Sequence, residues 1–425
     1  MCGYKTLYTG LWGPLRLLPL KGKGCENGDV HVAQGSAIYT GWGGLRDFGR
    51  CDGRLRGMSA PPISMVLTTY NHERFIGEAV QSALDQRYPN LEVVISDDGS
   101  TDGTWDVICE VVGRYKGPHT VVTHRQPDNV GPAANTFHAL STARGRFHVR
   151  AHGDDLSMPD RVAKVVALWQ RTGATLITHN ALQATGLGQP VKVLRPPGRT
   201  EQLSLDHICG QGWTSQMLGA TFSWDPKLFQ VFGPIDRTRL ERGGDHVWPL
   251  RAALLTGFWY LDEPLLLWRQ HPDQMTRKTA DFTGSTHVVG ETLTAYDLAP
   301  QLQRLRDVRK VGRPDLARAE NLVLQMIVNT AASWRMHRAK LMAEGMALTW
   351  VPRDGGPAVA DAAERQGAEA LVKAVDTVLF VHRSPAGPQK GAQLRHAVRV
   401  LMERAEVWSI ARQKLQLARL KPVWA

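Results

Sequence analysis

Four short runs rich in apolar and β-branched residues recur between residues 63 and 152, and segments of helical periodicity separate them. The runs read ISMVLTT, LEVVIS, HTVVTHR and RFHVRAH, at residues 63–69, 91–96, 119–125 and 146–152. In the segment after the first run, apolar residues recur at helical spacing from Phe75 to Leu84. Strand and helix alternating with short loops predict an α/β fold with a parallel, doubly wound sheet flanked by helices.

Polar clusters stand where three of the predicted strands end, at Thr69–Asn71, Asp97–Asp98 and Asp154–Asp155. Ligands of such sheets bind at the carboxyl ends of the strands. The adjacent acids Asp154 and Asp155 suit a hard divalent cation, which prefers carboxylate oxygens. They also suit the amino end of a helix, with Ser157 as its cap and Pro159 in its first turn. These residues alone leave both interpretations open.

The stretch VVISDDGSTDGT, residues 93–104, places acids and a glycine turn directly after the second predicted strand. An aspartate there can accept the imide proton of a uracil or thymine base, or contact a ribose. The simpler alternative is a turn that leads into a helix cap, since Asp, Gly, Ser and Thr are turn formers. We favour ligand contact for Asp98, and the turn and cap for Thr101 and Asp102.

Three segments, in their order along the chain, resemble segments of one known family. LTTYNHERFIGEAVQSALDQRYPNLEVVISDDGSTDGT (67–104), NVGPAANTFHAL (129–140) and HGDDLSMPDRV (152–162) resemble family 2 glycosyltransferases of the bacterial type, which have the GT-A fold. The resemblance covers roughly residues 60–275 and implies a GT-A (Rossmann-like), mostly parallel sheet flanked by helices. The family's glycine loop before the acceptor site has its counterpart in MLGATFS, residues 217–223.

The resemblance also implies roles for single residues. It assigns contacts with the nucleotide-sugar donor to Thr69, Tyr70, Asn71, Asp98 and Asp154.

A metal ion, Mn²⁺ or Mg²⁺, is implied with Asp155 and His271 as its ligands, Asp155 being favoured over Asp154. The catalytic base maps onto Asp245 in RGGDHVWPL, residues 242–250, at the start of a predicted helix. Family members often carry Glu before this Asp, whereas Gly244 stands here.

The implied function is metal-assisted, inverting transfer of a sugar from a nucleotide-diphosphate sugar to an acceptor hydroxyl. The implied setting is cell-surface or secreted glycan synthesis, with a glycan or lipid-linked acceptor. Two alternatives remain: a non-catalytic nucleotide- or glycan-binding module on the same fold, and a nucleotidyltransferase. LTTYNHERF, residues 67–75, lacks the glycine-rich, basic phosphate loop that nucleotidyltransferases usually carry near the first strand.

The regions flanking this domain have different compositions. Residues 1–57 hold 13 of the 41 glycines and three of the five cysteines, without strand or helix periodicity, which predicts a poorly ordered extension. Met58 would be a natural start, so these residues could be a misassigned extension. We therefore expect a GT-A domain over 58–280 and a helical C-terminal region over 284–425.

The chain is basic, with 51 Lys and Arg against 40 acids and a net charge of +11. No nucleic-acid motif interleaves this charge with aromatic residues, so we expect no nucleic-acid partner. From Lys390 onward there are eight basic residues against two Glu, which suits either peripheral contact with anionic lipid or a solvated face. No run of about 18 apolar residues occurs. The odd number of cysteines, without metal-type spacing, favours a reducing compartment, and hence a cytoplasmic location.

Overall fold

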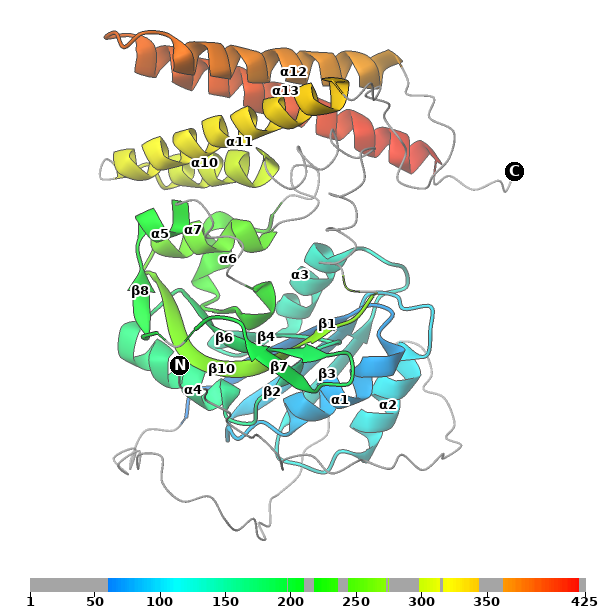
Figure 1. Cartoon of the computed structure of the whole chain (residues 1–425). Coiled ribbons are helices and arrows are strands. Elements are labelled where there is room, and N and C mark those ends of the chain that lie inside the picture. Colours follow the sequence, from blue (N-terminus) through cyan, green and yellow to red (C-terminus); the bar gives the residue numbers. More distant parts are fainter. Residues whose placement is uncertain are drawn as a thin grey trace, which may run out of the picture.

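The computed structural model describes residues 60–196, 198–209, 218–235, 244–272, 274, 298–313, 316–343 and 362–419. The extension expected over residues 1–57 lies outside these described residues. Figure 1 shows a twisted sheet with helices packed against it, and further helices stacked beyond one side of this α/β unit.

The first half of the sheet consists of the four predicted strands. They are β1 (Ile63–Thr69), β2 (Leu91–Asp97), β3 (Thr120–Arg125) and β4 (Phe147–His152). β2 and β4 flank β1, β3 lies outside β2, and all three pairings are parallel. The carboxyl ends of β1, β2 and β4 therefore meet at one edge of the sheet, as the sequence predicted.

The second half makes the sheet mixed. Its strands are β5 (Leu156–Ser157), β6 (Leu176–Thr185), β7 (Pro190–Val193), β8 (Glu201–Leu203), β9 (Ser223–Trp224) and β10 (Phe258–Gln270). The strand order is β3-β2-β1-β4-β9-β6-β10-β5, with β7 paired to β6 and β8 to β10. The short β9 runs antiparallel to both β4 and β6, whereas β6 and β10 are parallel. The α/β sheet is confirmed, and its long pairings are the parallel ones.

Four helices alternate with the early strands: α1 (Glu73–Leu84), α2 (Thr104–Arg114), α3 (Pro132–Thr142) and α4 (Arg161–Thr172). The apolar faces of α1, α2 and α4 and those of the strands form one buried cluster, to which Val80, Ile95 and Val166 belong. Ala139 of α3 packs against Val66 and Val94 in a separate, smaller cluster. The expected cap of α4 is wrong. Asp160 is the N-cap residue, and Ser157 lies in β5, where its hydroxyl accepts a hydrogen bond from Arg161 at 2.9 Å. The antiparallel pairing of Leu156 and Ser157 with β10 delays the helix beyond Pro159.

The remaining elements are mostly helical. They are α5 (Leu205–Cys209), the 3₁₀ turns η2 (Gly219–Thr221) and η3 (Gly244–His246), α6 (Lys227–Phe232), α7 (Trp248–Ala253), α10 (Ala299–Val311), α11 (Ala317–Ala343), α12 (Ala362–Arg383) and α13 (Lys390–Arg419). A single hydrophobic cluster runs from Trp224 and Trp248 through Leu305 and Ile327 to Val398. The helical C-terminal region is thus present in the described residues and shares its core with the sheet domain.

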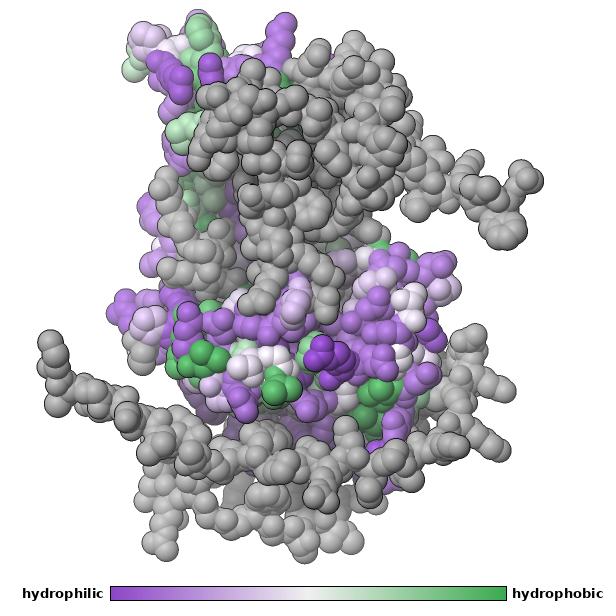
Figure 2. Space-filling model, turned by 45° about the vertical axis from the view of Figure 1, so that its right-hand side comes forward, coloured by the Kyte–Doolittle hydropathy of each residue, from purple (hydrophilic) through white to green (hydrophobic). Residues whose placement is uncertain are grey.

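Most of the described surface in Figure 2 is hydrophilic, with hydrophobic residues in small separate patches. None of the helices in the described part of the chain combines the length and the hydropathy that crossing a bilayer requires.

Candidate active site

Asp154 lies just beyond the carboxyl end of β4 and faces two imidazole rings. Its Oδ2 atom lies 3.2 Å from Nε2 of His271 and 3.9 Å from Nε2 of His72. His271 directly follows β10 and is packed against the ring of Phe75, with 4.4 Å between the ring centroids. His271, one of the two metal ligands that the resemblance implied, therefore lies beside the predicted acid pair.

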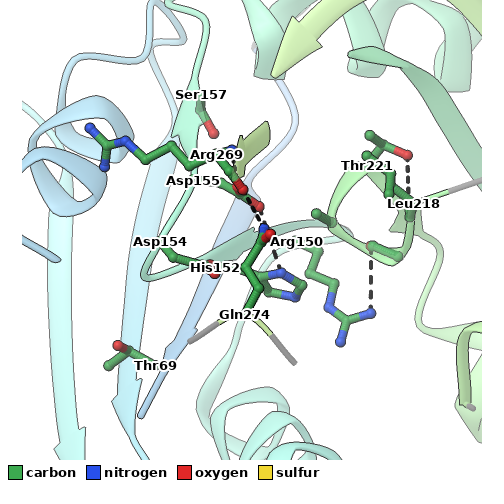
Figure 3. Close-up of polar contacts among 12 residues, drawn as sticks. Thr69, Arg150, His152, Asp154, Asp155, Ser157, Leu218, Thr221, Arg269 and Gln274 are labelled. Carbon is green, nitrogen blue, oxygen red and sulfur yellow. Dashed lines mark hydrogen bonds and ion pairs between the residues drawn. The ribbon is translucent and has the colours of Figure 1, made fainter. Parts of the chain in front are cut away.

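Asp155 points into the sheet instead. Its side chain is buried, and Oδ1 accepts a hydrogen bond from the backbone N–H of Arg269 at 3.1 Å (Figure 3). Its second oxygen, Oδ2, lies 3.9 Å from Nδ1 of His152. One carboxylate of the pair thus ties the loop after β4 to β10, while Asp154 stays partly open.

His152, Asp154 and Asp155 form the one group in the described residues whose potential metal ligands, one atom from each, all lie within 4.8 Å of one another. Burial lowers the pKa of His152 to about 4, helped by Arg150, so the ring is neutral at pH 7 and can donate a lone pair. Burial alone would raise the pKa of Asp154, but the hydrogen bond to His271 and the nearby imidazoles lower it to about 2. Burial and the adjacent Asp154 raise the pKa of Asp155 well above its ordinary value. The ionised Asp154 carboxylate beside the neutral imidazole of His152 fits a divalent cation that accepts both oxygen and nitrogen.

Three of the five predicted donor contacts, Thr69, Tyr70 and Asn71, lie at the end of β1 and in the loop that follows it. Thr69 is buried, with Oγ1 3.2 Å from Nδ1 of His72, whereas the Tyr70 side chain is 39% exposed. Asn71 has a positive φ of 54°, and its Oδ1 accepts a hydrogen bond from the backbone N–H of Thr101 at 2.9 Å. Asn71 therefore joins the loops after β1 and β2, and the side chain of Tyr70 beside it remains exposed.

Asp98 is buried at the end of β2, and its carboxylate accepts two backbone hydrogen bonds. The donors are the N–H groups of Val130, at 2.9 Å, and Gly131, at 2.8 Å, just before α3. Its contact with a nucleotide stays a prediction. Asp102 accepts from the N–H groups of Thr104, at 3.1 Å, and Glu73, at 3.2 Å, at the starts of α2 and α1. The turn-and-cap interpretation fits Asp102.

Asp245 lies in η3, just before α7, and its side chain is 41% exposed. Its Oδ1 accepts a hydrogen bond from Nη1 of Arg150 at 2.6 Å. Burial would raise the pKa of Asp245, but the charge and hydrogen bond of Arg150 lower it overall, so the carboxylate is ionised at neutral pH. His246, the residue after Asp245, is held by the C-terminal region. Nε of Arg304 on α10 donates a hydrogen bond to the carbonyl oxygen of His246 at 2.7 Å.

Three residues of the site were missed by sequence reasoning or set aside: His72, His152 and Arg150. A signal existed for Arg150, because an arginine inside an otherwise buried strand requires a partner. A weaker one existed for His152, two residues before Asp154 and at the same strand end. Nothing in the local sequence marked His72, whose position depends on how α1 meets the sheet.

The overall fold matches a solved structure. S. aureus TarS 1–349 in complex with UDP superposes with a TM-score of 0.50, covering 83% of this chain and 92% of that chain at 15% identity. At this identity the likeness shows the fold alone. The chain has the GT-A-type α/β fold, with a helical region following it.

The sequence comparisons find similar proteins. Residues 64–203 match the model of glycosyl transferase family 2. Among curated relatives, the glycosyltransferase EpsE of Bacillus subtilis is 35% identical over 133 residues, 31% of this chain and 45% of EpsE. The teichuronic acid biosynthesis glycosyltransferase TuaG of the same organism is 32% identical over 125 residues, 29% of this chain and 48% of TuaG. The chain spans about half the length of these relatives.

Proposed function

We propose that the protein transfers a sugar from a nucleotide-diphosphate sugar to an acceptor hydroxyl, with inversion at the anomeric carbon. The main support for the proposal is that one strand, β4, connects the proposed catalytic base with the proposed metal site. Its Arg150 contacts Asp245, and its end presents His152 and Asp154 at the metal-type cluster. The proposed base and the proposed site for the donor's diphosphate are therefore linked through β4.

For the metal, the geometry favours Asp154 with His271 over Asp155. One oxygen of Asp155 already accepts the Arg269 N–H, and its pKa is raised whereas the pKa of Asp154 is lowered, so Asp154 is the better anionic ligand. Asp154 Oδ2 and His271 Nε2, 3.2 Å apart, are at a separation that one ion can bridge. A divalent cation bound there would neutralise the negative charge that grows on the leaving diphosphate.

The base acts on the acceptor. As the acceptor oxygen forms its bond to the anomeric carbon, the bond from that carbon to the diphosphate oxygen breaks, and Asp245 takes the hydroxyl proton. Because Asp245 is ionised at neutral pH, it is ready to accept this proton. In this mechanism the acceptor oxygen displaces the diphosphate in a single step, and a single displacement produces inversion. Thr69, Tyr70, Asn71 and Asp98 are proposed to bind the donor nucleotide.

Incubation with a panel of nucleotide sugars and Mn²⁺ tests the proposal. We expect transfer or slow hydrolysis of one donor, and its loss in Asp154→Ala. Nucleotide binding without turnover of any donor would favour a binding module on the same fold.

The acceptor is proposed to be a glycan or a lipid-linked glycan in cell-surface or secreted polysaccharide synthesis. Peripheral membrane contact through the basic α13 belongs to the same proposal. Arg395, Arg399 and Arg404 are exposed on this helix, whereas Val398 and Leu401 pack into the core. The exposed arginines of α13 are therefore available to anionic lipid, while its buried side chains hold the helix in place.

A further inference from the structure

Arg150 is an arginine in the interior of β4, and only 9% of it is exposed. Its Nη1 donates to Asp245 Oδ1 at 2.6 Å and lies 3.5 Å from the carbonyl oxygen of Gly219. The guanidinium also lies over the ring of Trp248, 5.0 Å from its centroid. A buried charge is costly unless it is paired and hydrogen-bonded, so these three contacts define where the guanidinium sits.

Gly219 in η2 approaches the same carboxylate from another side. A Cβ atom built on Gly219 would overlap Asp245, first at Oδ2 and then at Cγ. The glycine therefore permits a backbone approach that any larger residue would prevent. In Figure 3 the Arg150 side chain points toward the turn that Leu218 and Thr221 bracket. Asp245 is thus held by a charge at one oxygen and by close backbone contact at the other.

We propose that Arg150 and Gly219 position the Asp245 carboxylate for the acceptor, an inference that rests on the proposed function. An aspartate rotates freely about its last side-chain bond unless a partner fixes it. The Arg150 hydrogen bond engages Oδ1 and fixes this rotation, while the exposed part of the side chain remains open to a hydroxyl group. Arg150 and Gly219 act through Asp245 and are positioning residues.

The charge of Arg150 also acts on the proton affinity of the base. The charged or titratable groups that face Asp245 are Arg150, His152 and His246, and each of them lowers the pKa of Asp245, with Arg150 contributing most. Loss of the guanidinium should therefore raise that pKa. The acidic limb of the kcat/KM profile should move to higher pH, an effect that a purely structural residue would not produce.

The experiment uses the full chain, with Arg150→Gln, Arg150→Lys and Gly219→Ala compared with the wild type and Asp245→Asn. We expect Arg150→Gln to lower kcat about 100-fold or more, the size of effect known for small misplacements of a catalytic group. The donor KM should stay within about threefold of the wild-type value. Arg150→Lys should recover part of the rate, because it keeps the charge but not the fixed geometry.

Gly219→Ala reaches the same carboxylate without removing a buried charge, and covers the case in which Arg150→Gln does not fold. It should lower kcat with little change in donor KM. The proposal is overturned if the foldable variants keep kcat within about threefold of the wild type, or if donor binding falls in parallel with kcat. Retained activity in Asp245→Asn would instead overturn the proposed function, so the two failures are distinguishable.

Discussion

The ion pair between Arg251 on α7 and Asp307 on α10 offers a quantitative test of how the C-terminal region supports the site. Both side chains are buried, and the pair is bidentate, with Nε to Oδ2 at 2.7 Å and Nη2 to Oδ1 at 3.2 Å. Gln303 adds a third donor at 3.0 Å. Burial raises the pKa of Asp307 although Arg251 opposes the shift, so the desolvation cost is large.

Asp307→Ala should therefore destabilise the fold by about 3–5 kcal/mol, because it leaves the Arg251 charge buried without its partner. The double variant Arg251→Met with Asp307→Ala should recover at least half of that loss, since a buried ion pair contributes little beyond its own desolvation cost. Urea denaturation of the wild type, both single variants and the double variant gives the four corners of the cycle.

The same substitution should reduce turnover. α10 also carries Arg304, which holds the carbonyl oxygen of His246 beside the proposed base. Loosening α10 from α7 should move that turn. A loss of less than about 1 kcal/mol in Asp307→Ala, or a double variant as unstable as the sum of the single ones, would refute the reasoning.

Three further outcomes are expected. Mn²⁺ should bind more tightly than Mg²⁺ in isothermal titration, because imidazole ligands suit Mn²⁺ better, and Asp154→Asn should weaken both; equal affinities would contradict an imidazole ligand. Burial lowers the pKa of His148 to about 4 from 6.5, so the unfolded chain binds the extra proton and stability should fall as pH drops from about 6.5 to 4. His148→Phe should flatten that fall, and an unchanged pH slope in urea denaturation would count against it. Finally, α13 carries three exposed arginines, Arg395, Arg399 and Arg404. Replacing all three by Glu should reduce sedimentation of the protein with anionic vesicles and leave transfer to a soluble acceptor unchanged. Undiminished sedimentation would contradict the lipid proposal.

The early sheet could be predicted from the sequence because each strand is encoded locally. The four predicted strands agree with β1 to β4 to within one residue at each end. The two-residue strands β5 and β9 carry no periodicity, since their pairing depends on where β10, β4 and β6 pass. The same dependence on a distant strand explains why Ser157 was wrongly expected as the cap of α4, because Ser157 pairs with β10 in the sheet.

In the candidate site, too, some residues could be predicted from the local sequence and others could not. Asp98, Asp154, Asp155 and Asp245 stand in recognisable motifs, so sequence reasoning found them. The neighbours that set their chemistry come from distant parts of the chain: Arg150 meets Asp245 across 95 residues, and His271 meets Asp154 across 117. These long-range contacts depend on the order of the strands in the folded sheet. Only the structure distinguishes the surroundings of the two acids, because Asp154 faces His271 and Asp155 accepts the Arg269 N–H.

The most direct test of the account is sugar transfer by Asp245→Asn, measured beside nucleotide binding by the same protein preparation. The substitution keeps the size of the side chain and removes its capacity to accept the acceptor proton. We predict that transfer falls by at least about 100-fold while the dissociation constant for the donor nucleotide stays within about threefold of the wild type. Transfer at the wild-type rate with unchanged binding would contradict the assignment of Asp245 as the base.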